Sequence, residues 1–479
     1  MTEQDLYLLS PLLILAGASV LVMLLIAANL THRKIQVITM ILFLFSFISL
    51  YFIETDLPHA IGPMLMMDGF GVLMTGLILF SGLVVNILSY IYFAEKEEGP
   101  REYYVLLLLA TFGACILAIS THFISFFLGL EILTVALYAL IAYLRERHHP
   151  VEAGIKYLIL AAFSSAFLLF GMGLIYLEAG TMNFAGIAEK LGTAGNFPVL
   201  AVAGTAMMLV GIGFKLAVVP FHLWPADVYQ GAPAPITALI ATASKAGVLA
   251  ALVRFFTQVD GMESHTLITV FACIAMASMI AGNLLALRQT NVKRTLAYSS
   301  IAHMGYLLVA ILPGSATGNQ AIAFYLVTYV LSSLTAFGVV TLLSSRDEDA
   351  EELARYRGLF WRSPVLAAFF TASLLSLAGI PLTAGFIGRF FTLPAATGGG
   401  QWAASLVLVL SSVIGLYYYL RIITAMFTEH EVPETESRKA HPLFFLFSSI
   451  TLTVVTFLIV WLGVSPAGFL EFMMVLTGR

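Results

Sequence analysis

The strongest constraint on this 479-residue chain is a succession of apolar runs, each about long enough to cross a membrane. The hydrocarbon core of a bilayer requires about 20 apolar residues in a helix that spans it. The runs lie near residues 8–30, 35–53, 70–94, 104–120, 122–144, 152–178, 198–221, 234–256, 266–288, 294–313, 318–345, 363–394, 401–427 and 442–470. The sequence therefore predicts an all-α membrane protein with about 14 transmembrane helices.

The composition excludes the common soluble classes. Sixty per cent of the residues are apolar and 10% are charged, whereas soluble domains are about 45–50% apolar and about 25% charged. A soluble chain of this length could not build a polar surface from so few charges. A soluble enzyme and a disordered regulator are thus excluded, and a net charge of −4 argues against nucleic acid as a partner.

Lysine and arginine predict the orientation, because they favour the cytoplasmic side of a membrane. Of the 23 basic residues, sixteen lie in the odd-numbered loops or at helix ends on that side, and three lie opposite. Both termini are therefore expected on the non-cytoplasmic side. The first apolar run follows Glu3 and Asp5 without a basic segment or cleavage pattern, which indicates a retained helix.

Five charged residues are interpreted as lying within the membrane and not at the ends of the predicted spans: Glu131, Lys156, Lys215, Lys245 and Arg389. A charge at mid-bilayer costs about 2.5–3.5 kcal/mol on insertion scales, so such residues usually pair and usually serve a function. The alternative for Glu131 is a protonated carboxyl hydrogen-bonded to a neighbouring helix. For Lys156, near the cytoplasmic end of its span, snorkelling to the surface is an equal alternative.

Two spans combine a proline with a cation. Lys215 precedes Pro220 in the seventh span, and Arg389 follows Pro381 in the twelfth. Proline interrupts a helix, and paired interrupted helices of opposite direction are typical of inverted-repeat transport folds. The sequence thus predicts inverted five-helix repeats over spans 4–8 and 9–13. The predicted divisions are an N-terminal three-helix segment (1–103), a first repeat (104–256), an inverted second repeat (266–427) and a C-terminal helix (442–479).

Two histidines are candidate proton-relay residues. His303 is in the middle of the tenth span beside hydroxyl-bearing neighbours, and His222 follows Pro220. A packed, hydrogen-bonded core histidine is the alternative for each. The acidic runs DEDAEE (347–352) and EHEVPETE (429–436) are interpreted as solvated loop charge, and the segment around Asp227 as a fixed turn.

Redox chemistry has no candidate residues in the sequence. Cys115 and Cys273 lie far apart in apolar runs, and there is no metal-ligand set, Walker motif or dinucleotide fingerprint. We therefore expect no cofactor and no metal in this chain.

Three segments resemble a known family. They are GFKLAVVPFHLWPADVYQGAPAPITALIATASK (213–245), QTNVKRTLAYSSIAHMGYLLVA (289–310) and SLAGIPLTAGFIGRF (376–390). They are similar to subunit N of bacterial NADH–quinone oxidoreductase, respiratory complex I, an antiporter-like membrane subunit. The resemblance covers about residues 60–430, and its DVYQGAPAP stretch is the most specific part.

The resemblance implies roles at matching positions. Glu131 and Lys215 match an input ion pair, Lys156 a sixth-helix lysine, and Lys245 the central lysine of the eighth helix. His222 and His303 match polar positions of the central axis. Arg389 stands where the family ordinarily has a lysine that exchanges protons with the outside, so the exit step is in doubt. The implied function is proton translocation coupled to quinone reduction elsewhere in the complex.

The resemblance also implies neighbouring subunits and a location, and several alternative functions stay open. Subunits K and M would be direct neighbours, J and A would belong to the same membrane arm, and flavin and iron–sulfur clusters would lie in other subunits. The implied location is the bacterial inner membrane, in contact with lipid. The alternatives are a cation/proton antiporter subunit, a structural spacer without its own proton path and, more weakly, a membrane hydrogenase subunit.

Overall fold

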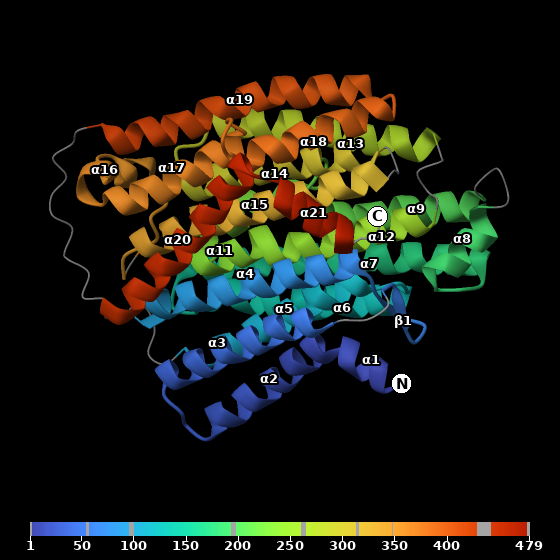
Figure 1. Ribbon diagram of the computed structural model, residues 1–479, viewed down its shortest axis with the longest axis horizontal. Coiled ribbons are helices and arrows are strands. Elements are labelled where there is room, and N and C mark those ends of the chain that lie inside the picture. The colour runs from blue at the N-terminus through green and yellow to red at the C-terminus, as the bar shows by residue number, and fades with distance from the viewer. Residues whose placement is uncertain are drawn as a thin grey trace.

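The computed structural model describes residues 2–53, 57–94, 100–192, 198–259, 265–312, 316–346, 348–428 and 442–476. Within these ranges the chain is almost entirely helical, as predicted. Long helices run side by side along the bundle (Figure 1). Large apolar side chains on its outside are exposed, among them Phe163 and Val413 at 66% each. This surface suits a lipid environment, in which apolar side chains need no burial inside the protein.

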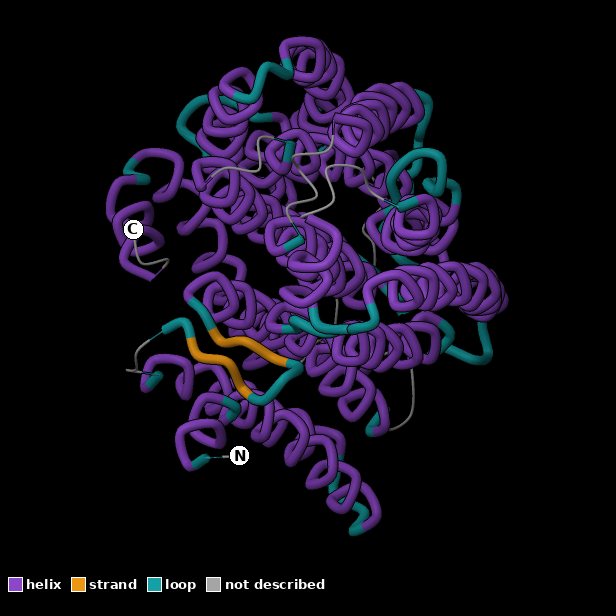
Figure 2. Tube along the Cα trace, turned by 90° about the vertical axis from the view of Figure 1, so that its right-hand side faces the viewer, coloured by secondary structure: helices purple, strands orange, loops and turns teal. Residues whose placement is uncertain are grey.

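The N-terminal part consists of α1 (Glu3–Leu8), α2 (Ser10–Ala27), α3 (His32–Ser49), η1 (Leu50–Phe52), β1 (His59–Ile61), β2 (Leu65–Met67) and α4 (Gly69–Ala94). The two strands pair antiparallel, a small hairpin that the apolar runs did not predict. Figure 2 shows this hairpin beside the N-terminal helices at one end of the bundle. Helices α2 and α3 pack together and against α5 and α4.

The next helices are α5 (Glu102–Ile119), α6 (Phe123–Ile141), α7 (His148–Ala179), α8 (Phe184–Gly192), α9 (Val199–Leu216), α10 (Trp224–Gly231), α11 (Ala234–Leu239), the π-helical turn η2 (Ile240–Ser244) and α12 (Lys245–Gln258). The segment around Asp227, expected to be a turn, is the short helix α10. It packs on α7 and α14. Segments α11, η2 and α12 form one continuous rod that is buried from Ala234 to Phe256.

The remaining elements are α13 (His265–Leu287), α14 (Val292–Ile311), α15 (Ala316–Leu343), η4 (Leu353–Tyr356), α16 (Leu359–Arg362), α17 (Pro364–Ala378), α18 (Ala384–Gly398), α19 (Trp402–Phe427), α20 (Pro442–Val464) and α21 (Ala467–Leu476). Neighbour relations recur between the halves. Helices α5–α6, α7–α9 and α12–α5 pack together, as do α13–α14, α15–α17 and α19–α13. A duplicated arrangement predicts this recurrence; the repeat limits themselves stay a prediction.

Twelve of the described helices are long and apolar enough to cross a membrane. Helix α14 has the length but carries Lys293 and Arg294 in its first turn, and the twelfth apolar run is divided between α17 and α18. These elements together account for the fourteen predicted runs. The last run differs in detail, because it ends at Val464 and a separate helix, α21, follows.

Helix α20 lies across α15, α17, α18 and α4 (Figure 1). At Gly463 it touches backbone: a Cβ there would lie 2.4 Å from Thr383, in the segment between α17 and α18. We therefore expect Gly463→Ala to displace α20 and destabilise the protein by about 1–3 kcal/mol, as overpacking does. Unfolding of the detergent-solubilised protein would measure this. Gly468→Ala is the control, since a Cβ at Gly468 meets nothing within 4 Å; equal stability of both variants would contradict the expectation.

Candidate functional site: a buried proton axis

Helix α9 stops in mid-run, as Pro220 predicted. Its last helical residue is Leu216, and Ala217 adopts a left-handed conformation with φ of 61°. The amides of Ala217 and Val218 bond back to Phe214 and Gly213, the pattern of a Schellman cap. Two side chains from outside α9 satisfy further backbone groups: the Trp224 indole donates to the Phe214 carbonyl at 2.8 Å, and Ser278 accepts from the Val219 amide at 2.9 Å.

Lys215 lies in the last turn of α9 and is 4% exposed. Its ammonium donates to the Thr134 hydroxyl on α6 at 2.6 Å and lies 5.2 Å from the centre of the Tyr157 ring. Such a cation is favourable at a helix C-terminus, where the dipole is negative.

Glu131 lies one turn before Thr134 on α6 and is half-buried. It accepts a hydrogen bond from Ser165 of α7. Among the ion pairs of the described residues, none joins Glu131 to Lys215. Lys215 of α9 thus contacts α6 at Thr134, one turn after Glu131.

Lys245 is the first residue of α12, directly after the π-helical turn η2, and is 1% exposed. Single π-turns inside α-helices occur frequently at functional sites. The Lys245 ammonium donates to the Ser300 hydroxyl of α14, which also accepts from Tyr329 of α15 at 2.8 Å. Lys245 therefore connects the two halves of the chain through neutral hydroxyl groups.

His303 lies one turn beyond Ser300 on α14 and is 2% exposed. Its Nδ1 lies 2.8 Å from the Tyr325 hydroxyl and its Nε2 lies 3.1 Å from the Tyr419 hydroxyl. The Tyr329 ring is centred 5.2 Å from the imidazole. Both ring nitrogens thus have partners, an arrangement that serves a packed core histidine and a proton relay equally.

Helix α17 ends in the same way as α9. Gly379 has a φ of 77°, and the amides of Gly379 and Ile380 bond back to Ser376 and Leu375. Arg389, on α18, reaches back to this end and donates to the carbonyls of Leu377 and Ala378, the latter at 2.7 Å. Its guanidinium thereby satisfies carbonyls that the interruption leaves without helical partners.

The surroundings of Arg389 contain no carboxylate partner. The residue is 8% exposed and its guanidinium carbon lies 4.9 Å from the centre of the Tyr306 ring, and no ion pair among the described residues includes it. A Cβ at Gly379 would lie 2.8 Å from the Arg389 Nη1 atom. Glycine therefore favours the left-handed conformation here and leaves room for the approach of the guanidinium.

The two interruptions are not equivalent in their charges. When Ala217 is matched to Gly379, Lys215 corresponds to Leu377 and not to Arg389. The neutral Trp224 indole caps the first broken helix and the charged Arg389 caps the second. The two segments that share a proline and a cation in the sequence therefore have different local structures.

Lys156 and His222 lie apart from these contacts. The Lys156 side chain is 46% exposed and pairs with Glu152 at 2.8 Å and with Asp227 at 3.2 Å. Burial raises the pKa of the Asp227 carboxyl, but hydrogen bonds from Arg294 and Lys156 outweigh it and hold that pKa below its usual value. His222 is half-buried, and its Nδ1 lacks a hydrogen-bond partner. Both alternatives for Lys156, snorkelling and a place at the site, stay predictions.

The interpretation of residues 347–352 as solvated charge was wrong for two of its members. The Asp349 side chain is 7% exposed and pairs with the fully buried Lys293 at 2.8 Å. Glu351 accepts from Gln230 and Asn291 at 3.0 and 2.7 Å. A sequence window cannot predict this, because the partners come from α10 and from the start of α14. Residue 347 and the run 429–436 lie outside the described residues.

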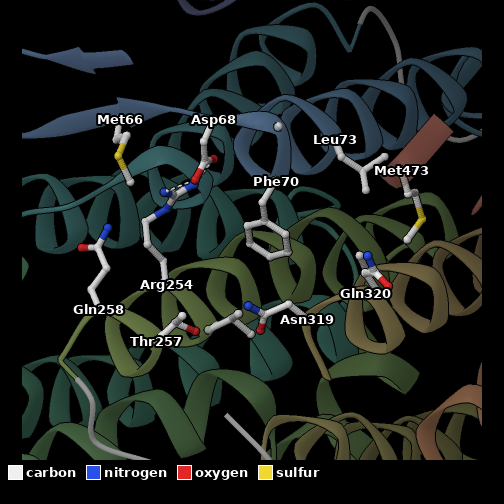
Figure 3. Close-up of a pocket in the computed structure, with 13 residues that line it drawn as sticks. Met66, Asp68, Phe70, Leu73, Arg254, Thr257, Gln258, Asn319, Gln320 and Met473 are labelled. Carbon is white, nitrogen blue, oxygen red and sulfur yellow. Dashed lines mark hydrogen bonds and ion pairs between the residues drawn. The ribbon is translucent and has the colours of Figure 1, made fainter. Parts of the chain in front are cut away.

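A cavity of about 230 Å³ lies where α4, α12, α15 and α21 meet. Figure 3 shows Arg254 and Asp68 pointing toward each other at its wall, and their bidentate contacts measure 2.7 and 2.9 Å. Arg254 also donates to the Ala118 carbonyl. Apart from this ion pair, the cavity is lined by apolar side chains, the Thr257 hydroxyl and the amides of Gln258, Asn319 and Gln320. In the part of the chain that the structure describes, no group of histidine, cysteine and acidic residues is arranged to hold a metal ion.

Sequence reasoning missed most partners of the charged groups. Tyr325 and Tyr329 are spaced four residues apart, which places them on one face of a helix, and this spacing was a usable signal. Thr134 follows Glu131 at the same kind of interval. Ser165, Trp224 and Tyr419 left no such signal, because only the packing of distant helices brings them to the site.

The chain is similar to known membrane proteins along most of its length. A family model described as "NADH:quinone oxidoreductase/Mrp antiporter, TM" matches residues 120–415. A chain of respiratory complex I from Thermus thermophilus is 33% identical, with a TM-score of 0.82, over 96% of this chain and 98% of that one.

Two further solved complexes share the architecture. A chain of the Mrp complex from Dietzia sp. DQ12-45-1b superposes with a TM-score of 0.87 at 22% identity, covering 100% of this chain and 98% of that one, which shows a common fold. A chain of the membrane-bound sulfane sulfur reductase, an archaeal respiratory membrane complex, gives a TM-score of 0.84 at 25% identity over 98% and 96%. The chain belongs to the transmembrane family of NADH:quinone oxidoreductases and Mrp antiporters, as an antiporter-like membrane subunit.

Proposed function

We propose that the chain is the subunit N type of proton-translocating subunit in the membrane arm of a bacterial NADH–quinone oxidoreductase. The observation that carries the proposal is the axis of buried protonatable groups: Lys215 at the end of a broken helix, Lys245 after a π-turn, and His303 within hydroxyl contacts. The 33% identity to a complex I chain over nearly the whole length favours complex I as the setting.

The proposed mechanism is electrostatic. A nearby carboxylate favours the protonated form of a lysine, and desolvation favours the neutral form. When Glu131 approaches Lys215, the ammonium keeps its proton; when they separate, the buried cation tends to release it. Lys245 is the next acceptor, and Ser300 leads from it toward His303. The groups then titrate as a coupled set, and quinone reduction elsewhere in the complex supplies the motion.

The proposal includes partners and location. We expect contacts with subunits K and M, with J and A in the same membrane arm, and a place in the bacterial inner membrane with both termini on the periplasmic side. Lys156 and His222 remain proposed members of the proton path, at its periphery.

The test is to purify the native complex from membranes and identify what co-purifies. The proposal expects flavin- and iron–sulfur-bearing subunits, and proton uptake by vesicles that depends on NADH and quinone. Sodium/proton exchange by a complex that lacks those subunits would favour the cation/proton antiporter alternative instead, for which the shared fold is the supporting observation. Retention of full pumping after apolar replacement of Glu131 and Lys215 would favour a structural spacer.

We also expect the isolated chain to be colourless. The only cysteines are Cys115 and Cys273, too few for a Cys₄ iron–sulfur cluster, and no flavin- or haem-attachment motif occurs in the sequence. A visible absorption spectrum of the purified subunit checks this. The protein must be concentrated enough for one flavin per chain to be detected. A stoichiometric chromophore that survives separation from the other subunits would contradict it.

A further inference from the structure

The side chain of Lys293 uses all three of its donors inside the protein. Its ammonium binds the Gln230 carbonyl at 2.9 Å, the Ala232 carbonyl at 2.7 Å and the Asp349 carboxylate at 2.8 Å. The other Asp349 oxygen accepts from the Tyr92 hydroxyl of α4 at 2.6 Å. Because the Lys293 side chain is fully buried, this is an ion pair shielded from solvent screening.

The contacts of Lys293 join the starting points of two helices that carry the proton axis. Ala232 lies two residues before α11, which continues through η2 to Lys245. Lys293 is the second residue of α14, and Ser300 follows two turns later on the same helix. Lys245 and Ser300 are the residues that meet across the two halves.

Helices transmit displacement along their axes because their backbone hydrogen bonds make them stiff. At about 1.5 Å per residue, Lys245 lies about 20 Å along its rod from Ala232, and Ser300 about 10 Å from Lys293. A change in the distance between the two starting points would therefore separate the Lys245 ammonium from the Ser300 hydroxyl. Proton transfer between two groups requires them to stay in a defined geometry, so little such movement is tolerated.

The loop that supplies Asp349 is itself fixed. The Tyr356 hydroxyl donates to the Ala350 carbonyl at 2.7 Å, and the Ser344 hydroxyl accepts from the Ala350 amide at 3.1 Å. Glu351 binds both Gln230 and Asn291, and so adds a second link between the end of α10 and the start of α14. Asp349 is thus held in place independently of Lys293.

We infer that Lys293 and Asp349, with the carbonyls of Gln230 and Ala232, form an inter-half clasp that positions Lys245 against Ser300. Neither Lys293 nor Asp349 carries the proton in this role; both are positioning residues. The inference rests on the proposed proton translocation, because its consequence is a lower yield of pumped protons with electron transfer intact.

The test compares two adjacent carboxylates in the whole complex. Asp349→Asn removes the buried charge, whereas Glu348→Gln makes the same change on a side chain that is 71% exposed. We expect Asp349→Asn to lower the protons pumped per NADH oxidised about tenfold, the scale of a lost charge-assisted hydrogen bond. Glu348→Gln should match the unsubstituted complex, and Lys293→Arg, which keeps the charge, should restore most of the yield lost in Lys293→Met.

Assembly is measured in the same preparations by native gel and by NADH–quinone activity. Equal pumping by Asp349→Asn and Glu348→Gln overturns the clasp. If Asp349→Asn does not assemble, the double variant Lys293→Met/Asp349→Leu replaces both charges with apolar side chains: assembled complex with low pumping supports the clasp, and either normal pumping or failed assembly overturns it. Absence of pumping by the unsubstituted complex would instead refute the proposed function.

Discussion

Lys215→Met is expected to abolish proton pumping while leaving the complex assembled. Lys215 is the buried cation at the interrupted end of α9, and Met fills a similar volume beside Tyr157 without a charge. Loss of a positioned proton-transfer group lowers the rate by about 10²–10⁴-fold. Proton uptake by inverted vesicles, driven by NADH with quinone present, measures the effect. Glu131→Gln should slow pumping less severely, because Gln still accepts the Ser165 hydrogen bond.

The matched control is Lys190→Met, the same substitution on an exposed lysine of α8. It should pump at the rate of the unsubstituted complex. Assembly and NADH–quinone activity must be measured in parallel. If the complex does not assemble, the loss of pumping gives no information about Lys215. Full pumping in the assembled Lys215→Met complex would show that Lys215 is not part of the proton path.

Substitution of Arg389 should separate charge from proton transfer. Guanidinium stays protonated at every physiological pH, so Arg389 is proposed as a fixed charge that repels protons near His303 and prevents back-flow. Its contacts with the Leu377 and Ala378 carbonyls give the charge a second role as the cap of α17. We therefore expect Arg389→Lys to keep most of the pumping and Arg389→Gln to reduce it by about tenfold or more, since an uncapped buried carbonyl costs about 1–3 kcal/mol.

Vesicle pumping and the proton leak after the substrate is exhausted are the two measurements. A fixed charge that blocks back-flow predicts a faster leak in Arg389→Gln than in Arg389→Lys. Arg362→Gln, on an exposed arginine, serves as the control for loss of one positive charge. Unimpaired pumping with an unchanged leak in Arg389→Gln would mean that arginine is merely tolerated at a wet position.

The sequence by itself determined the class of the protein and the location of its interruptions. Apolar runs of about 20 residues must become helices in a bilayer, because lipid offers no hydrogen bonds to an open backbone. Proline removes an amide wherever it stands, so Pro220 and Pro381 predicted the ends of α9 and α17 without any knowledge of their neighbours. The charged residues near the middle of apolar runs, Glu131 and Lys245, were also evident, since a charge at mid-bilayer usually has a partner or a function.

Only the tertiary structure decided what each charge contacts. Thr134, not Glu131, binds Lys215 directly; Ser300 binds Lys245; and backbone carbonyls, not a carboxylate, bind Arg389. The burial of Asp349 against Lys293 is another contact between segments that are distant in the sequence. Hydrophobicity acts on each residue separately and can be summed along a chain, whereas a hydrogen bond depends on the distance and angle between two groups. For residues far apart in the sequence, that geometry exists only after the helices have packed.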